Sequence, residues 1–121
     1  MSNIKTKTEL KISVEVPGSH CYPESDNLYL QNPHRHNFLI SVFLEVTDLN
    51  REIEFYDFAA KIYYLLTARF KQDELGTYDF ETNSCEHLAD WLLWEFNQDG
   101  FNVTKVEVAE DRYNSATVRR A

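Results

Sequence analysis

Glycine, proline and cysteine are scarce in this sequence of 121 residues, which has three glycines, three prolines and two cysteines. So few glycines and prolines leave no room for a flexible linker or a low-complexity tract. Two cysteines, Cys21 and Cys85, are too few for the disulfide framework of a small secreted domain. No apolar run approaches the ~20 residues that a transmembrane helix needs, and no apolar stretch follows the lysines near Met1. We therefore expect no signal peptide, no membrane association and a cytoplasmic protein.

Positive charge is also in short supply. The chain has 12 Lys and Arg against 20 Asp and Glu, a formal net charge of −8. An acidic surface repels phosphate groups, which disfavours nucleic acids and anionic membranes as partners. Hydrophobic residues make up 43% and charged residues 26%, the proportions of an ordinary folded protein. Together with the chain length, this composition predicts a single domain over residues 1–121.

The hydrophobic pattern changes its period along the chain. Alternation of apolar and polar residues predicts strands with one buried face, and spacings of three and four predict amphipathic helices. The resulting order, β-β-α-α-β-β, predicts an α+β fold in which two helices cover one face of a four-stranded antiparallel sheet. The expected elements are strands at 9–16 (stopped by Pro17-Gly18) and 37–46, a helix at 55–70, a helix between 82–84 and Gly100, and strands at 103–109 and 113–119.

Three of the four histidines lie around residues 19–33, a stretch that predicts a long and therefore functional loop. His34 and His36 come just at the start of the second strand, where residues two apart point to the same face. Antiparallel pairing with the first strand brings His20 beside them. Three neutral imidazoles with an open fourth position are typical of a catalytic zinc site, although imidazole also suits iron and nickel. The alternative is three ordinary surface histidines near a loop.

A lone histidine followed by His-x-His-Asn-Phe resembles the family of 6-pyruvoyl-tetrahydropterin and 6-carboxytetrahydropterin synthases. The segments Ile53–Phe58, Asn83–Ala89 and Val106–Glu110 resemble further motifs of that family, in the same order. The resemblance implies the tunnelling fold, Zn²⁺ held by the three histidines, and trimers that join into hexamers with sites between subunits. It also implies a lyase acting on 7,8-dihydroneopterin triphosphate or a related pterin.

The same resemblance assigns two residues to the pterin ring. Glu110 stands where the family anchors the ring, and one carboxylate can accept both N–H groups that a pterin or guanine presents side by side. The alternative is a solvated acid at a strand end beside Asp111. Ser84 stands where the family has a ring-contacting threonine, and its alternative is a helix N-cap.

The sequence departs from the family at the groups that move protons on the substrate. The family's catalytic cysteine would fall at Leu30 and its Asp-His pair near Arg69–Lys71, and this chain has neither. Cys21 and Glu24 are the candidate catalytic replacements: a thiolate beside the metal, or a carboxylate base, which some family members use. The alternatives are a buried cysteine and a solvated glutamate.

Two hypotheses of different classes follow from this pattern. The first is a zinc-dependent pterin-forming lyase of tetrahydropterin or queuosine biosynthesis. The second is a degenerate relative that binds a pterin or purine without turnover, because all three proton-transfer groups of the family are missing. A weaker third is an altered reaction on another purine or pterin. His87, on the second expected helix, is predicted to be a surface or core-edge residue rather than a ligand.

The last expected strand, 113–119, predicts self-association. It contains no proline and its one charged residue is Arg119, so little blocks pairing along its edge. Leu39 and Phe43 would lie on the sheet face that the helices leave open. We therefore expect a homo-oligomer, trimer-based and hexameric by the resemblance, with metal sites near subunit boundaries.

Overall fold

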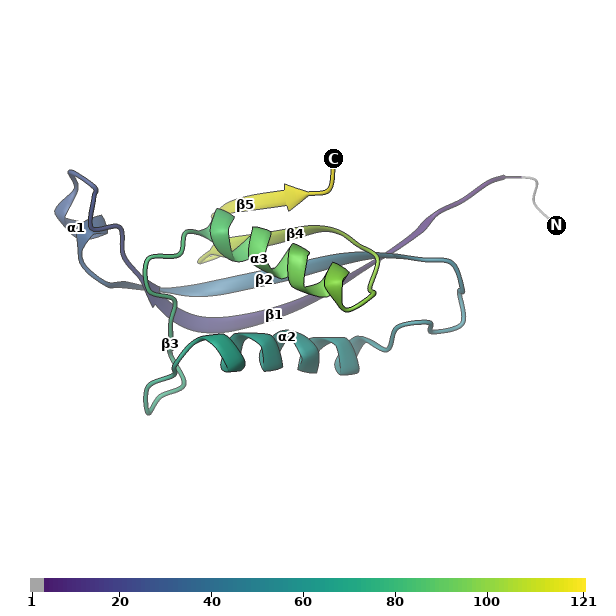
Figure 1. Ribbon diagram of the computed structural model, residues 1–121, viewed down its shortest axis with the longest axis horizontal. Coiled ribbons are helices and arrows are strands. Elements are labelled where there is room, and N and C mark those ends of the chain that lie inside the picture. The colour runs from purple at the N-terminus through teal and green to yellow at the C-terminus, as the bar shows by residue number, and fades with distance from the viewer. Residues whose placement is uncertain (1–3) are drawn as a thin grey trace.

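The computed structural model describes residues 4–121, which form one sheet with helices packed against it (Figure 1). The sheet order is β3-β1-β2-β4-β5, so that the two longest strands lie side by side near its middle. In chain order the elements are β1 (Thr8–His20), α1 (Leu28–Gln31), β2 (His34–Val46), α2 (Phe55–Arg69), β3 (Tyr78–Asp79), α3 (Cys85–Gln98), β4 (Val103–Glu110) and β5 (Asn114–Arg119).

The α+β class and the element order agree with the sequence, and the strand count and pairing need correction. The expected four strands are all antiparallel neighbours, as predicted. A fifth strand, β3, pairs in parallel with Gly18 and Ser19 of β1, which makes the sheet mixed. The strand β3 lies between the two expected helices, where the sequence predicted no strand, because alternation cannot show over only two residues. The predicted loop 19–33 likewise contains the four-residue helix α1.

The first strand does not stop at Pro17-Gly18, as its sequence predicted, but continues to His20. At Pro17 the strand pairs with β2 on one side only, because β3 pairs with Gly18 and Ser19. Proline is tolerated at such an edge position, since its missing N–H need not donate to a neighbouring strand. Gly18 is required by a close approach, since a Cβ there would lie 2.4 Å from Cε2 of Phe80. This extension pairs His20 directly with His34.

The helices α2 and α3 cover one face of the sheet, and the core lies between these layers (Figure 1). The Glu54 carboxylate caps α2 by accepting the N–H of Asp57, and the Ser84 hydroxyl caps α3 by accepting the N–H of His87. Helix α3 buries more of its length than α2. The buried residues of the two helices are Phe58, Ile62 and Leu66 in α2, and Cys85, Leu88, Ala89, Leu92, Leu93 and Phe96 in α3.

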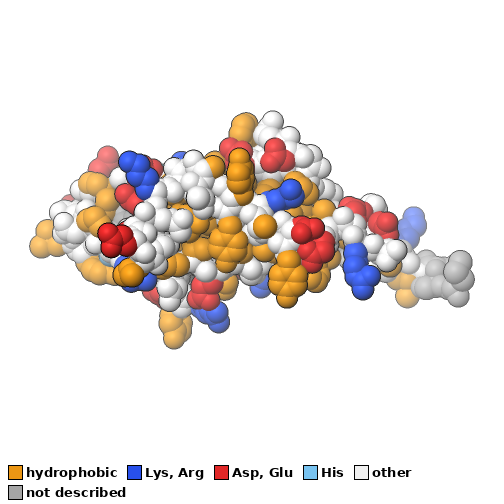
Figure 2. Space-filling view, turned by 90° about the horizontal axis from the view of Figure 1, so that it is seen from below, with side chains coloured by type: hydrophobic (Ala, Val, Ile, Leu, Met, Phe, Trp, Pro, Cys, Tyr) orange, Lys and Arg blue, Asp and Glu red, His pale blue; other side chains and the backbone are white. Residues whose placement is uncertain are grey.

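The outer surface keeps several large apolar side chains. On the open face of the sheet Phe43 is half-buried, with the ammonium groups of Lys11 and Lys105 lying 5.7 Å and 4.5 Å from its ring centroid. On α2, Tyr56 and Tyr64 are exposed, and the view from below shows hydrophobic side chains among charged ones (Figure 2). Within residues 4–121 no helix is long and apolar enough to cross a membrane.

Candidate metal centre

Three imidazoles converge at one end of the β1–β2 ladder. One nitrogen from each of His20, His34 and His36 lies within 4.8 Å of the other two. His20 and His34 are opposite each other in the register, and His36 follows two residues later on the same face of β2. The strand geometry thus brings together the three side chains that the sequence singled out.

Every one of these rings has its Nδ1 atom occupied. Nδ1 of His20 lies 2.9 Å from the carbonyl oxygen of Asn83, and Nδ1 of His34 lies 3.0 Å from that of Asn32. Nδ1 of His36 lies 2.6 Å from Oδ2 of Asp111. Because carbonyl and carboxylate oxygens only accept, each Nδ1 carries the hydrogen and donates it. Nε2 is therefore the nitrogen that each ring could present to a metal.

An aromatic layer supports the cluster from below. The ring of Phe38 is fully buried, and its centroid lies 5.2 Å from that of His20 and 5.9 Å from that of His36. Tyr29, on α1, covers His34 with its ring centroid 4.7 Å away. Packing on both sides fixes the imidazole planes, and an apolar layer beneath them excludes water from that side.

Asp111 is a site residue that the sequence analysis passed over as the neighbour of Glu110. Its carboxylate accepts from His36 and, at 2.8 Å, from the backbone N–H of Asn37, and its own N–H donates to the carbonyl of Asn37. These donors, the Asn37 N–H first and the His36 ring second, lower the pKa of Asp111. Its φ of 52° turns the chain out of β4 so that the side chain points back to β2. The one sequence signal for this role is an acidic residue directly after β4, the strand that pairs with the His-x-His strand β2.

Glu110 reaches the histidines from β4. Its Oε1 lies 3.0 Å from Nε2 of His20, and its Oε2 lies 3.6 Å from Nε2 of His36. The thiol of Cys85 donates to Oε1 at 3.6 Å. Burial, together with the nearby Glu110 charge, raises the pKa of Cys85 to about 12, so this thiol stays protonated at neutral pH. Cys85 is thus a hydrogen-bond donor to Glu110 and no nucleophile.

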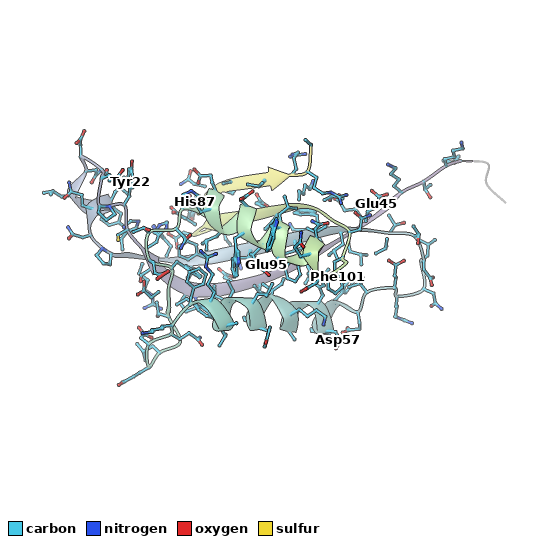
Figure 3. All side chains as sticks on the ribbon, in the orientation of Figure 1. Tyr22, Glu45, Asp57, His87, Glu95 and Phe101 are labelled. Atoms are coloured by element: carbon cyan, nitrogen blue, oxygen red, sulfur yellow. The ribbon has the colours of Figure 1, made fainter. Side chains whose placement is uncertain are left out.

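A cleft of about 360 Å³ opens beside the histidines, between the loop after β1 and the start of α3. His87 and Tyr22 lie at this end of the molecule, His87 on α3 and Tyr22 in the loop (Figure 3). Glu24 is exposed and does not line the cleft. The lining residues are His20, Cys21, Tyr22, Leu30, His34, Thr82, Asn83, Ser84, Glu86, His87 and Glu110.

The positions that lack the family's proton-transfer groups have structural roles of their own. Leu30 presents an apolar side chain to the cleft. Phe70 is buried, and the guanidinium of Arg69 lies 4.6 Å from the ring centroid of Trp91. Ser84 is the N-cap of α3 and also lines the cleft, so its two sequence-based interpretations are compatible.

The donor set fits a divalent transition metal. Three imidazole nitrogens with their second nitrogens held by carbonyl and carboxylate oxygens are the usual surroundings of Zn²⁺, and they also accommodate Fe²⁺, Co²⁺ or Ni²⁺. Among residues 4–121 these histidines are the group of ligating side chains whose atoms all lie close enough to share one ion.

Comparison with known proteins places the fold. No family model and no curated protein sequence matches the chain. Among solved structures, an uncharacterized protein from Wolinella succinogenes superposes with a TM-score of 0.67 at 14% identity, over 97% of this chain and 100% of that one. The 6-pyruvoyl tetrahydropterin synthase of Caenorhabditis elegans gives a TM-score of 0.65 at 15% identity, over 96% of this chain and 97% of its own. The chain has the fold of a 6-pyruvoyl tetrahydropterin synthase.

A second 6-pyruvoyltetrahydropterin synthase, from Plasmodium vivax, carries cysteine in place of a catalytic glutamate. It superposes with a TM-score of 0.61 at 14% identity, over 96% of this chain and 99% of its own. The resemblance that the sequence motifs indicated is confirmed for the fold, with nearly complete coverage of both chains.

Proposed function

We propose that this protein is a metal-dependent enzyme of pterin chemistry, a carbon–oxygen lyase acting on 7,8-dihydroneopterin triphosphate or a closely related pterin. The observation that carries the proposal is the histidine cluster. All three Nδ1 atoms are held by oxygen acceptors, which leaves the Nε2 atoms as the ring nitrogens that could bind an ion, and His20 and His34 line a cleft. The fold shared with 6-pyruvoyl tetrahydropterin synthases supports the substrate class.

The proposal gives each side of the cleft a task. His20, His34 and His36 hold the ion, and Zn²⁺ bound there would polarise the substrate's side-chain oxygens and acidify the neighbouring carbon. At the start of α3, Ser84 offers a hydroxyl to the ring, and the Glu110 carboxylate accepts the two adjacent N–H groups of a pterin. The cleft is large enough for one bicyclic ring.

Elimination of the triphosphate breaks one carbon–oxygen bond after a base takes the proton from the neighbouring carbon, so a base must reach that carbon. Cys21 lines the cleft next to a metal ligand and is the candidate with the better position. Glu24 is exposed in the same loop, and a movement of the loop would have to bring it inward. A glutamate is the catalytic residue replaced in the Plasmodium vivax protein, which keeps Glu24 a candidate.

The test is turnover of 7,8-dihydroneopterin triphosphate by the zinc-loaded protein, measured as triphosphate release and as product absorbance. We expect conversion by the wild type, none by His36→Ala, and a loss of about 10²-fold or more in Cys21→Ser. If Glu24→Gln loses the rate and Cys21→Ser keeps it, the carboxylate is the base. No conversion at enzyme concentrations near those of the substrate would sink the lyase proposal.

A second candidate function is binding of a pterin or purine without turnover. The observation that favours it is Leu30, an apolar side chain in the cleft at the position where the family has its cysteine. Neopterin or guanine would then raise the melting temperature in proportion to its concentration and be recovered unchanged. A ligand that is consumed, or one that leaves the melting temperature unmoved, contradicts this alternative.

We also propose that the chain works as a homo-oligomer, with a trimer-based hexamer as the expected size. Within residues 4–121 the outer edge of β5 pairs with no strand, and half-buried Leu39 and Phe43 lie on the open face of the sheet. Sedimentation at micromolar concentration should give several times the 14.3 kDa of one chain. A species of one chain's mass contradicts the proposal.

A further inference from the structure

Two asparagines beside the histidines are held by the same pattern of hydrogen bonds. The backbone carbonyl of Asn83 accepts the Nδ1 hydrogen of His20 at 2.9 Å, and the backbone carbonyl of Asn32 accepts that of His34 at 3.0 Å. A carbonyl can orient an imidazole only if the peptide unit that carries it is itself fixed. We propose that the side-chain amides of Asn83 and Asn32 are positioning groups for the candidate metal ligands His20 and His34.

The amide of Asn83 closes a turn against the end of β1. Its Nδ2 donates to the carbonyl of Phe80 at 2.9 Å, and the backbone N–H of Asn83 donates to the same carbonyl at 3.0 Å. Phe80 is fully buried, and its own N–H donates to the carbonyl of Ser19 in β1. The turn is therefore anchored to the strand that carries His20. Without the amide, the backbone bond alone would fix the peptide of Asn83.

The amide of Asn32 does the same on the other side of the cluster. Its Nδ2 donates to the carbonyl of Leu28 at 2.9 Å, and its backbone N–H donates to that carbonyl at 3.3 Å. Asn32 is the C-cap of α1, and a helix of four residues has little stability of its own. The double donation to one carbonyl thus occurs in two turns of different sequence, and both turns present a carbonyl to a histidine.

Each asparagine also has a local role, because asparagine side chains commonly close turns and cap helices. Asn32 ends α1, and Asn83 directly precedes Ser84, the N-cap of α3. The two roles differ in what they predict. Capping alone affects the stability of the fold, whereas positioning also affects the hydrogen on one particular imidazole and the affinity of the cluster for a metal ion.

The first test compares Zn²⁺ binding, by chelator competition, in Asn83→Ala, Asn32→Ala and Asn97→Ala. Asn97 is the matched control, because it is also an asparagine whose Nδ2 donates to backbone carbonyls, but it lies at the far end of α3. We expect the first two changes to weaken binding by about three- to tenfold, less than the ~10–100-fold typical of losing an outer-shell partner, because the carbonyl itself remains. Asn97→Ala should lower only the free energy of unfolding. Wild-type affinity in Asn83→Ala or in Asn32→Ala overturns the proposal for that residue.

The second test needs neither metal nor substrate. Nuclear magnetic resonance of the metal-free, ¹⁵N-labelled protein follows the exchange of the Nδ1 hydrogens of His20 and His34 with water. We expect the His20 hydrogen to exchange about tenfold faster in Asn83→Ala and the His34 hydrogen in Asn32→Ala, each without change at the other ring. A general loss of stability would speed both. Unchanged exchange, or equal acceleration at both rings, overturns the proposal.

The first test rests on the metal centre of the proposed function, and the two failures can be told apart. If the wild type binds no Zn²⁺, the proposed function fails, and the exchange measurement alone decides the positioning role. If the wild type binds Zn²⁺ and converts the pterin while both asparagine variants behave as wild type in both tests, the positioning role fails and the proposed function stands.

Discussion

The two sides of the cleft are built differently. On the strand side, the three histidines rest on a long antiparallel ladder, every Nδ1 atom has a partner, and Phe38 lies buried beneath them. On the loop side, Tyr22, Glu24 and Leu30 belong to a segment whose side chains are mostly exposed, with a single four-residue helix. Metal ligands must hold fixed positions, and the strand side supplies that rigidity through packing and hydrogen bonds.

This difference indicates that the fold itself positions the metal ligands, while the candidate base depends on the loop. The register fixes the positions of the ligating nitrogens, since a shift by one residue would turn His34 and His36 to the other face. The candidate base on the loop, Cys21 or Glu24, depends on a segment with few buried contacts, and such segments open at low free-energy cost. We therefore expect metal binding to be robust to changes on the loop side and turnover to be sensitive to them.

The largest effect is expected from removing a ligand on the strand side. His34→Ala should lower Zn²⁺ affinity by more than the ~10–100-fold typical of losing an outer-shell partner. His87→Ala, the change to the fourth histidine, should leave the affinity within threefold of wild type, because that side chain belongs to α3 and has no place in the ligand cluster. Competition with a chromophoric chelator measures both. Similar losses in the two variants would show that the cluster does not bind the metal.

A smaller effect is expected when the ladder beneath the site is disturbed. In Gly18→Ala the new Cβ would meet the ring atoms of Phe80 at 2.4 Å and 2.7 Å, and the buried rings have little room to give way. We expect a loss of about 1–3 kcal/mol in the free energy of unfolding, measured by urea denaturation. Ser19→Ala is the control, because it keeps the backbone carbonyl that accepts the N–H of Phe80. Wild-type stability of Gly18→Ala would mean that the site end of β1 is less tightly packed than the structure shows.

Asp111→Asn should produce the next smaller effect. An amide oxygen can accept from His36 or from the backbone N–H of Asn37 but carries no charge, so the imidazole becomes a weaker ligand. Because Asp111 is partly exposed, we expect a loss of Zn²⁺ affinity near the lower end of the ~10–100-fold range. Asp90→Asn, an exposed acid on α3, should have no effect. An unchanged affinity in Asp111→Asn would limit its role to ending β4.

The sequence predicted the elements that have a periodic hydrophobic pattern and missed the elements that are too short to show one. Long alternating or helical patterns placed the four main strands and both long helices, because burial on one face imposes a period. Local signals misled where tertiary contacts override them. The pair Pro17-Gly18 predicts the end of a strand. The strand β1 nevertheless continues to His20, because Phe80 packs on Gly18 and β3 pairs with β1 only beyond Pro17. Two-residue β3 and four-residue α1 are too short to have a period.

The same division holds for the site. The three histidines could be predicted because the spacing of His34 and His36 and the antiparallel return of the chain are properties of neighbouring strands. Asp111 could not, because its role depends on the β2–β4 register and on a left-handed φ after β4. The position of Glu110 beside His20 and His36 depends on the same register, which no sequence motif specifies.

The smallest effect is expected on the loop side, where Leu30→Cys would place a thiol at the position of the family's catalytic cysteine. Leu30 is exposed to 37%, and its replacement removes little buried area, so the free energy of unfolding should change by no more than about 0.5 kcal/mol. Zn²⁺ affinity should be unchanged, because no ligand or ligand partner is altered. Thermal melts and chelator competition check both, with Leu30→Ser as the control that adds polarity without a thiol.

If the loop side lacks only a proton-transfer group, Leu30→Cys should raise turnover of 7,8-dihydroneopterin triphosphate while Leu30→Ser does not. A large loss of stability or of metal affinity in both variants would instead show that the two sides of the cleft are coupled, and the comparison between a rigid strand side and a tolerant loop side would be wrong.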